Sequence, residues 1–82
     1  IQYTFNMAFP ITKDITIYNK AFDTVCKGWK TKFGFKPVFA LSDVSDSAFT
    51  YAFTIFVDSS KLLLEFKSSF MEDIAKSVYK PG

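Results

Sequence analysis

AFTYAFTIFV, residues 48–57, is the stretch that decides the fold of this chain. Successive side chains of an extended backbone point to opposite faces, so the stretch divides into two sets of five. One face would carry Phe49, Tyr51, Phe53, Ile55 and Val57, and the other Ala48, Thr50, Ala52, Thr54 and Phe56. Aromatic and β-branched residues at nearly every position are typical of a half-buried pleated surface. The pattern predicts the central strand of a small sheet.

The composition indicates a small domain with an aromatic core. A chain of 82 residues is expected to form one domain over residues 1–82, near the lower size limit for a self-sufficient core. Eleven Phe, four Tyr and one Trp compensate, because each large ring can bury about 150–250 Å². Aromatic residues are also enriched at protein interfaces, so part of this surplus fits a partner's footprint.

Several function classes are disfavoured by residues that the chain lacks. It has one cysteine, Cys26, and no histidine, so it has no internal disulfide, no usual general base and no imidazole metal ligand. We therefore expect no enzyme activity and no cofactor. No apolar run approaches the roughly 20 residues of a membrane span, which favours a cytoplasmic protein without membrane contact.

The basic residues disfavour a further function class, sequence-specific recognition of nucleic acid. The net charge is only +2, and all ten basic residues are lysines. Arginine supplies the planar fork that reads guanine edges and grips phosphate, so its absence disfavours a sequence-specific nucleic-acid reader. Residues with AT-rich codons also outnumber those with GC-rich codons. This bias suggests an AT-rich genome, and hence a phage or viral accessory factor acting on a host protein in the host cytoplasm.

Residues 1–9 predict a second strand, with one wet face. Ile1, Tyr3, Phe5, Met7 and Phe9 alternate with Gln2, Thr4, Asn6 and Ala8. Pro10 is expected to end the strand. None of the nine side chains is charged, so an exposed edge of this strand would be open to pairing with another chain.

A helix is predicted from the first turn after Thr12 to about Phe33. Thr12 is the expected N-cap, Asp14 would lie in the first turn, and Gly34 is the expected C-terminal stop. The apolar arc of this helix would contain Ile15, Tyr18, Phe22, Val25, Cys26, Trp29 and Phe33. On that arc Cys26 is expected to be a small core residue rather than a nucleophile.

The rest of the chain predicts a hairpin and a second helix. Residues 38–41 would form a short strand, 42–47 a polar turn and 61–79 a helix capped by Asp58, Ser59 or Ser60. The second helix has an apolar arc wider than the cover of a small sheet requires: Leu63, Leu64, Phe66, Phe70, Met71, Ile74, Ser77 and Val78. Lys67 lies within this arc, either extending its methylenes along it or pairing with a partner's acid.

The order of these elements fixes a topology. We expect an α+β fold, a β-α-β-β-α two-layer sandwich, because a right-handed crossover makes the first and second strands parallel. If the third strand lies between them, the sheet is three-stranded, antiparallel, in the order 1-3-2, with both helices on one face. This arrangement resembles a ferredoxin-like sandwich that lacks its fourth strand, a resemblance of fold only.

The outward face of that sheet is the first candidate site. It would carry the partner-binding residues Gln2, Thr4, Asn6, Thr50, Thr54 and Phe56. A flat surface of small side chains suits homodimerisation or docking onto a partner protein, although it can also be a plain wet face. Stacking of RNA bases is disfavoured, because Phe56 is the only aromatic residue of this set.

A lysine cluster is the second candidate site. Four lysines within ten residues, with no acid among them, could contact phosphate or an acidic partner: Lys27, Lys30, Lys32 and Lys36. Trp29 or Phe35 could supply a stacking ring. The alternative is a solvated helix end, where cations suit the helix dipole.

The remaining acidic residues favour structural roles. Asp43, Asp46 and Asp58 fit no calcium-loop spacing, so turn and cap roles are expected for them, and no metal site.

Taken together, these features predict a small non-enzymatic interaction protein that is homodimeric and that binds and inhibits another macromolecule. Its partner is expected to be a protein, a second copy of itself, or both. The alternative is a nucleic-acid-binding module that uses the lysine cluster.

Overall fold

The computed structural model describes residues 2–79 of the chain, so the predicted inward position of Ile1 lies outside the described residues. Its elements are β1 (Gln2–Pro10), α1 (Ile15–Phe33), β2 (Val38–Val44), β3 (Ala48–Phe56) and α2 (Ser60–Val78). Both helices end within one residue of the predicted position, and the strand order β1-β3-β2 is the predicted one.

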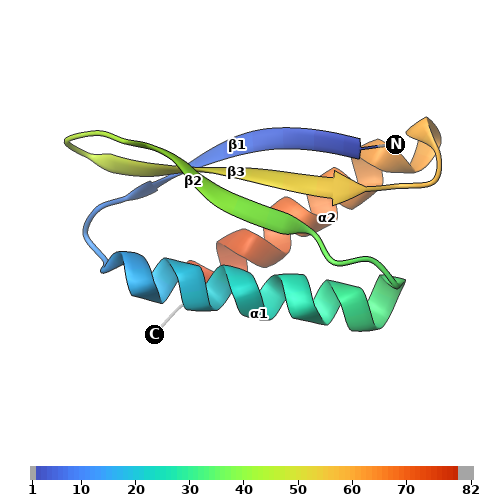
Figure 1. The fold of residues 1–82 in the computed structure, drawn as a ribbon, viewed down its shortest axis with the longest axis horizontal. Coiled ribbons are helices and arrows are strands. Elements are labelled where there is room, and N and C mark those ends of the chain that lie inside the picture. Colours follow the sequence, from blue (N-terminus) through green and yellow to red (C-terminus); the bar gives the residue numbers. More distant parts are fainter. Residues whose placement is uncertain (1, 80–82) are drawn as a thin grey trace.

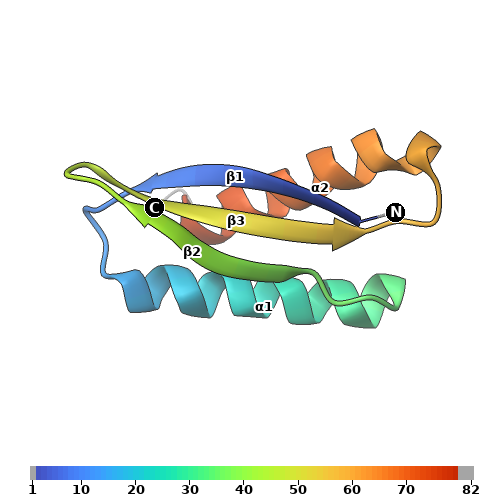
Figure 2. The ribbon, with the colours of Figure 1, turned by 45° about the horizontal axis from the view of Figure 1, so that its top comes forward.

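The sheet is antiparallel throughout and has β3 at its centre. Phe53 of β3 lies opposite Phe5 of β1 and opposite Phe39 of β2. Both helices cover the same face, α1 on the side of β2 and α2 on the side of β1 (Figures 1 and 2). Ring contacts agree with this placement, because Phe22 of α1 meets Phe39 and Phe70 of α2 meets Phe5. The predicted two-layer β-α-β-β-α fold is therefore confirmed.

The core is a layer of aromatic rings between the sheet and the helices. Phe22 lies at its centre, with its ring centroid 4.9 Å from those of Phe9 and Tyr51 and 5.2 Å from that of Phe53. The buried set is drawn from every element except β2: Phe5, Phe9, Tyr18, Phe22, Cys26, Trp29, Tyr51, Phe53, Ile55, Phe70, Ile74 and Val78. Edge-to-face pairs of this kind add to the stabilisation from area burial.

The start of α1 differs from the prediction. Asp14 is the N-cap, and Thr12 lies in the turn that precedes it. The Asp14 carboxylate accepts hydrogen bonds from the Thr16 hydroxyl at 2.6 Å and from the Thr16 backbone N–H at 2.8 Å. These bonds lower the pKa of Asp14, the hydroxyl contributing more than the amide. A carboxylate can satisfy both donors at once, which the Thr12 hydroxyl cannot do from two residues further back.

The end of α1 matches the prediction. Gly34 adopts a left-handed conformation with φ of 83°, and its backbone N–H donates to the carbonyl of Lys30. In α2 the N-cap is Ser59, one of the three predicted candidates, although its side chain makes no capping hydrogen bond.

The hairpin is longer than predicted. β2 continues to Val44 through an irregularity between Leu41 and Asp43, so Asp43 lies in a strand rather than in a turn. The Ser42 hydroxyl donates to the carbonyl of Thr50, which holds the extra residue of this bulge against β3. The turn is confined to residues 45–47, where the Ser45 hydroxyl accepts from the backbone N–H of Ala48 at 3.1 Å.

Candidate functional site

The outer face of the sheet carries the first candidate site, and neither helix covers it (Figure 2). The register arranges its side chains in rows that cross the three strands. The rows are Thr4, Thr54 and Val38; Asn6, Ala52 and Ala40; and Ala8, Thr50 and Asp43, with the pair Gln2 and Phe56 beyond the first row. We call these eleven residues the open face. The six partner-binding residues predicted from the sequence are thus brought together on one surface.

Small and uncharged side chains dominate the open face. Asp43, next to the hairpin turn, is the only charged residue in its rows. The hydroxyls of Thr4 and Thr54 are hydrogen-bonded to each other across the strands at 2.8 Å. This bond lowers the cost of desolvating these two hydroxyls, because each already has a partner on the protein.

Phe56 occupies the end of the open face rather than its middle. Its side chain is 37% exposed, and its ring centroid lies 6.4 Å from that of Phe35, which follows α1. The ring therefore leans toward the loop between α1 and β2. A single aromatic ring at the end of the face does not form the stacking platform that sheet-type RNA binders use.

The structure adds three residues from β2 that the sequence-based set lacked: Val38, Ala40 and Asp43. Val38 and Ala40 follow from the alternation of 38–41 once the sheet order is known. Asp43 does not follow from it. Simple alternation would place Asp43 on the inner face, but the bulge shifts the register by one residue and places it on the open face.

The lysine cluster does not form a single surface. Lys30 and Lys32 are two residues apart in the last turn of α1, which places them about 200° apart around the helix. Lys27 is paired with Asp23 at 2.8 Å, and this contact lowers the pKa of the Asp23 carboxyl, with a smaller contribution from Lys36. Trp29, which could have supplied a stacking ring, is only 4% exposed.

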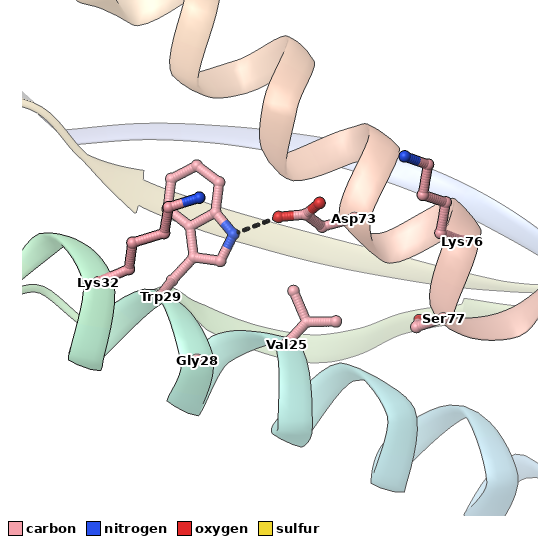
Figure 3. Close-up of a pocket in the computed structure, with 7 residues that line it drawn as sticks. All are labelled: Val25, Gly28, Trp29, Lys32, Asp73, Lys76 and Ser77. Atoms are coloured by element: carbon pink, nitrogen blue, oxygen red, sulfur yellow. Dashed lines mark hydrogen bonds between the residues drawn. The ribbon is translucent and has the colours of Figure 1, made fainter.

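A hollow between α1 and α2 contains the principal polar contact between the helices (Figure 3). The Trp29 indole N–H of α1 donates to the Asp73 carboxylate of α2 at 2.7 Å. The hollow measures about 390 Å³ and is floored by Val25 and Gly28. Sequence reasoning assigned Trp29 to the core but missed Asp73 as its partner, because no local pattern reveals a contact between two residues that lie 44 positions apart on different helices.

Two lysines line the rim of this hollow, and each contacts a neighbour on its own helix. Lys76 pairs with Glu72 at 2.9 Å on the surface of α2. Lys32 extends over the ring of Phe33, with its nitrogen 5.3 Å from the ring centroid. The Trp29–Asp73 bond at this hollow joins the two helices. Because the indole N–H already has its acceptor, the described residues of the hollow present no unpaired buried donor.

Cys26 is a core residue, as predicted. Its side chain is fully buried, and burial raises the pKa of its thiol to about 11, with Lys36 opposing the rise and Asp23 adding to it. A thiol of this kind is protonated at neutral pH and is a poor nucleophile. Within residues 2–79 no cluster of cysteine and acidic side chains could hold a metal ion, so Asp43, Asp46 and Asp58 do not converge.

Lys67 contacts the protein's own aromatic rings. Its ammonium group donates to the Tyr3 hydroxyl at 3.2 Å and lies 5.2 Å and 5.8 Å from the ring centroids of Tyr3 and Phe5. The charge is therefore turned beneath β1, which agrees with the predicted path of the side chain along the apolar arc.

Comparison with other proteins assigns no family. No model of a known protein family matches the sequence, and a search of curated proteins finds no significant match. Neither of the helices described in residues 2–79 has the length and apolar character needed to cross a membrane.

Proposed function

We propose that this protein is a non-enzymatic interaction module that docks its open face onto a partner protein and inhibits that partner by covering its surface. The observation that carries the proposal is the open face itself, a row-by-row array of small side chains with one charge, on the side of the sheet that the helices leave free. A protein surface that is flat and nearly uncharged over three strands is suited to packing against another sheet or helix layer.

The chemistry of the chain supports binding rather than catalysis. There is no histidine, the single thiol is buried with a raised pKa, and the acids closest to lysines, Asp23 and Glu72, are engaged in surface ion pairs. A module without a catalytic group acts on a partner through occlusion or through a shift of its conformational equilibrium.

The open face is smaller than a standard specific interface. Nine residues at about 3.4 Å each and three strands about 4.8 Å apart give roughly 400 Å². A standard specific interface buries about 800 Å² on each partner. One copy of the open face therefore supplies about half of such an interface.

Photo-crosslinking in cells of the natural host tests the proposal. A photoreactive phenylalanine analogue is placed at position 54, in the middle of the open face, or at position 69, on the solvent side of α2, as the matched control. Position 54 is expected to capture a defined protein that position 69 does not capture. Equal capture from both positions, or none from position 54, would refute docking through the open face.

A further inference from the structure

The free edge of β1 exposes backbone groups that can be assigned to individual residues. The Ile11 N–H donates to the carbonyl of Ser47 at 3.2 Å, and this pair continues the register in which Pro10 lies opposite Ala48. In an antiparallel ladder, residues bonded to the neighbouring strand alternate with residues whose N–H and C=O point away. The backbone N–H and C=O groups of odd-numbered β1 residues therefore bond to β3. Those of even-numbered residues, which we call the outward residues, point away from β3 at the free edge of the sheet.

Pro10 gives independent support for this assignment. It has no N–H, so it fits an outward position, where a proline breaks no bond of the sheet. Its carbonyl accepts a hydrogen bond from the Tyr18 hydroxyl at 2.6 Å rather than from β3. The edge available for pairing therefore consists of Gln2, Thr4, Asn6 and Ala8, and Pro10 marks its end.

Nothing in these four residues protects the edge. Exposed edge strands are normally guarded by charges, prolines or bulges, because their free backbone groups can pair with another chain. The opposite edge, β2, has such guards: Pro37 precedes it, a bulge interrupts it after Leu41, and Asp43 lies within it. The two edges of the sheet therefore differ in their readiness to pair.

The flank of α2 next to β1 is apolar. Leu64 is 75% exposed, and Met71 and Ala75 are partly exposed, on the side of α2 that faces away from α1. Lys67 belongs to the same side, but its ammonium group is turned inward onto Tyr3. The edge of β1 and this flank of α2, which lies next to β1 in the helix layer (Figure 2), form one strip through both layers of the molecule, in which Lys67 is the charged side chain.

We propose that this strip, which we call the seam, binds a second copy of the same chain. Two β1 edges pair antiparallel about a two-fold axis normal to the sheet, giving a continuous six-stranded sheet with three strands from each copy and all helices on one face. Because the axis is normal to the sheet, the open faces of the two copies lie on the same side of the continuous sheet. The outward residues of one β1 edge then lie opposite the outward residues of the other.

One register uses every outward residue and avoids Pro10. It places Gln2 opposite Ala8 of the second copy, and Thr4 opposite Asn6, with about eight backbone hydrogen bonds across the seam. Leu64 and Met71 of the two α2 helices then approach each other beneath the paired strands. A second copy fits this strip because both halves carry the same spacing of backbone donors and acceptors, and the Lys67 ammonium group of each half is already held by its own Tyr3.

The area agrees with a modest dimer. A seam of seven paired residues, about 24 Å long, and two layers, or about 20 Å, deep buries roughly 500 Å² on each copy. The total of about 1,000 Å² is at the threshold for a specific interface. The dimer would also join two open faces into one of about 800 Å², the standard size for one partner; this benefit rests on the proposed function, whereas the seam does not.

Sedimentation equilibrium over a range of protein concentrations tests the seam. The wild-type chain is compared with Leu64→Lys, with Asn6→Pro, which removes one outward N–H, and with Ser69→Lys as the charge-matched control, each checked for folding by circular dichroism. We expect a wild-type dimer, a dissociation constant raised at least about tenfold by Leu64→Lys and by Asn6→Pro, and no change with Ser69→Lys. A wild-type chain that stays monomeric at about 100 μM, or Leu64→Lys and Asn6→Pro variants that dimerise like the wild type, would overturn the proposal.

Ala52→Lys separates the seam from the proposed function. Ala52 lies on the central strand, where both neighbours are already paired, so a lysine there alters the open face and leaves the seam intact. This variant is expected to dimerise normally and to lose the protein captured from position 54. Dimerisation lost in Ala52→Lys but kept in Leu64→Lys would place self-association on the open face and would refute the seam alone.

Discussion

The two faces of β3 differ more than any other pair of regions in the molecule. On the inner face Tyr51, Phe53 and Ile55 are at most 1% exposed and contact rings or aliphatic groups from both helices. On the outer face Thr50, Ala52 and Thr54 are small and partly exposed, with nothing from the described residues packed over them. The fold depends on the first set, which leaves the second set available for recognition of another molecule.

The largest effect is expected from the inner face. Phe53→Ala removes a ring that contacts Phe5, Phe9, Phe22 and Phe70 and should lower the free energy of unfolding by about 3–5 kcal/mol. Thr54→Ala, its neighbour on the outer face, should lower it by about 1 kcal/mol or less. Urea unfolding followed by circular dichroism measures both, and similar losses would contradict the division of labour between the faces.

A smaller effect is expected where the two helices meet. Asp73→Ala leaves the buried Trp29 indole N–H without its acceptor and should lower the free energy of unfolding by about 1–2 kcal/mol. The matched control is Glu72→Ala, which removes only a surface ion pair with Lys76. Urea midpoints that shift equally in the two variants would show that the Trp29–Asp73 bond does not stabilise the packing of α1 against α2.

The buried thiol predicts a pH dependence of stability. Because the pKa of Cys26 is raised from 9.0 to about 11, the folded state retains the thiol proton where the unfolded chain has lost it. The contribution is fully present below about pH 9 and is lost as the pH rises through about 11. The urea midpoint of the wild type should therefore fall between pH 8 and pH 10.5 by more than that of Cys26→Ala. Equal decreases in the two proteins would show that the Cys26 thiol does not contribute to the pH dependence of stability.

The smallest effect is expected from nucleic acid. Lys30 and Lys32 point to different sides of α1 and Lys27 is paired with Asp23, so the four lysines do not act together as one basic site. We expect the mobility of DNA and RNA fragments to be unchanged by the protein at about 50 mM salt. A shift that disappears steeply with added salt, and that is lost in Lys30→Ala, would favour the lysines over the open face as the site of recognition.

The sequence predicted those features that depend on periodicity. The two-residue alternation of 48–57 and of 2–9 identified both faces of the sheet, and the order of elements then determined which strand is central. Gly34 was predictable because few other residues adopt its left-handed conformation.

Features that depend on tertiary contacts could not be predicted. The Trp29–Asp73 bond joins two helices whose relative placement no local pattern specifies. The bulge at Leu41–Asp43 arises from the register of β2 against β3 and moves Asp43 onto the open face. Likewise the wide apolar arc of α2 was visible in the sequence, but only the fold shows that Leu64 projects into solvent next to an unguarded strand edge.

The affinity of the captured partner for two charge-matched variants is the most direct test of the central claim, that the open face is the docking surface. Isothermal titration of the purified partner compares Ala52→Lys on the outer face of β3 with Ser69→Lys on α2. We predict that Ala52→Lys weakens binding by at least about tenfold while Ser69→Lys binds as the wild type does. Equal affinities of the two variants would contradict the account.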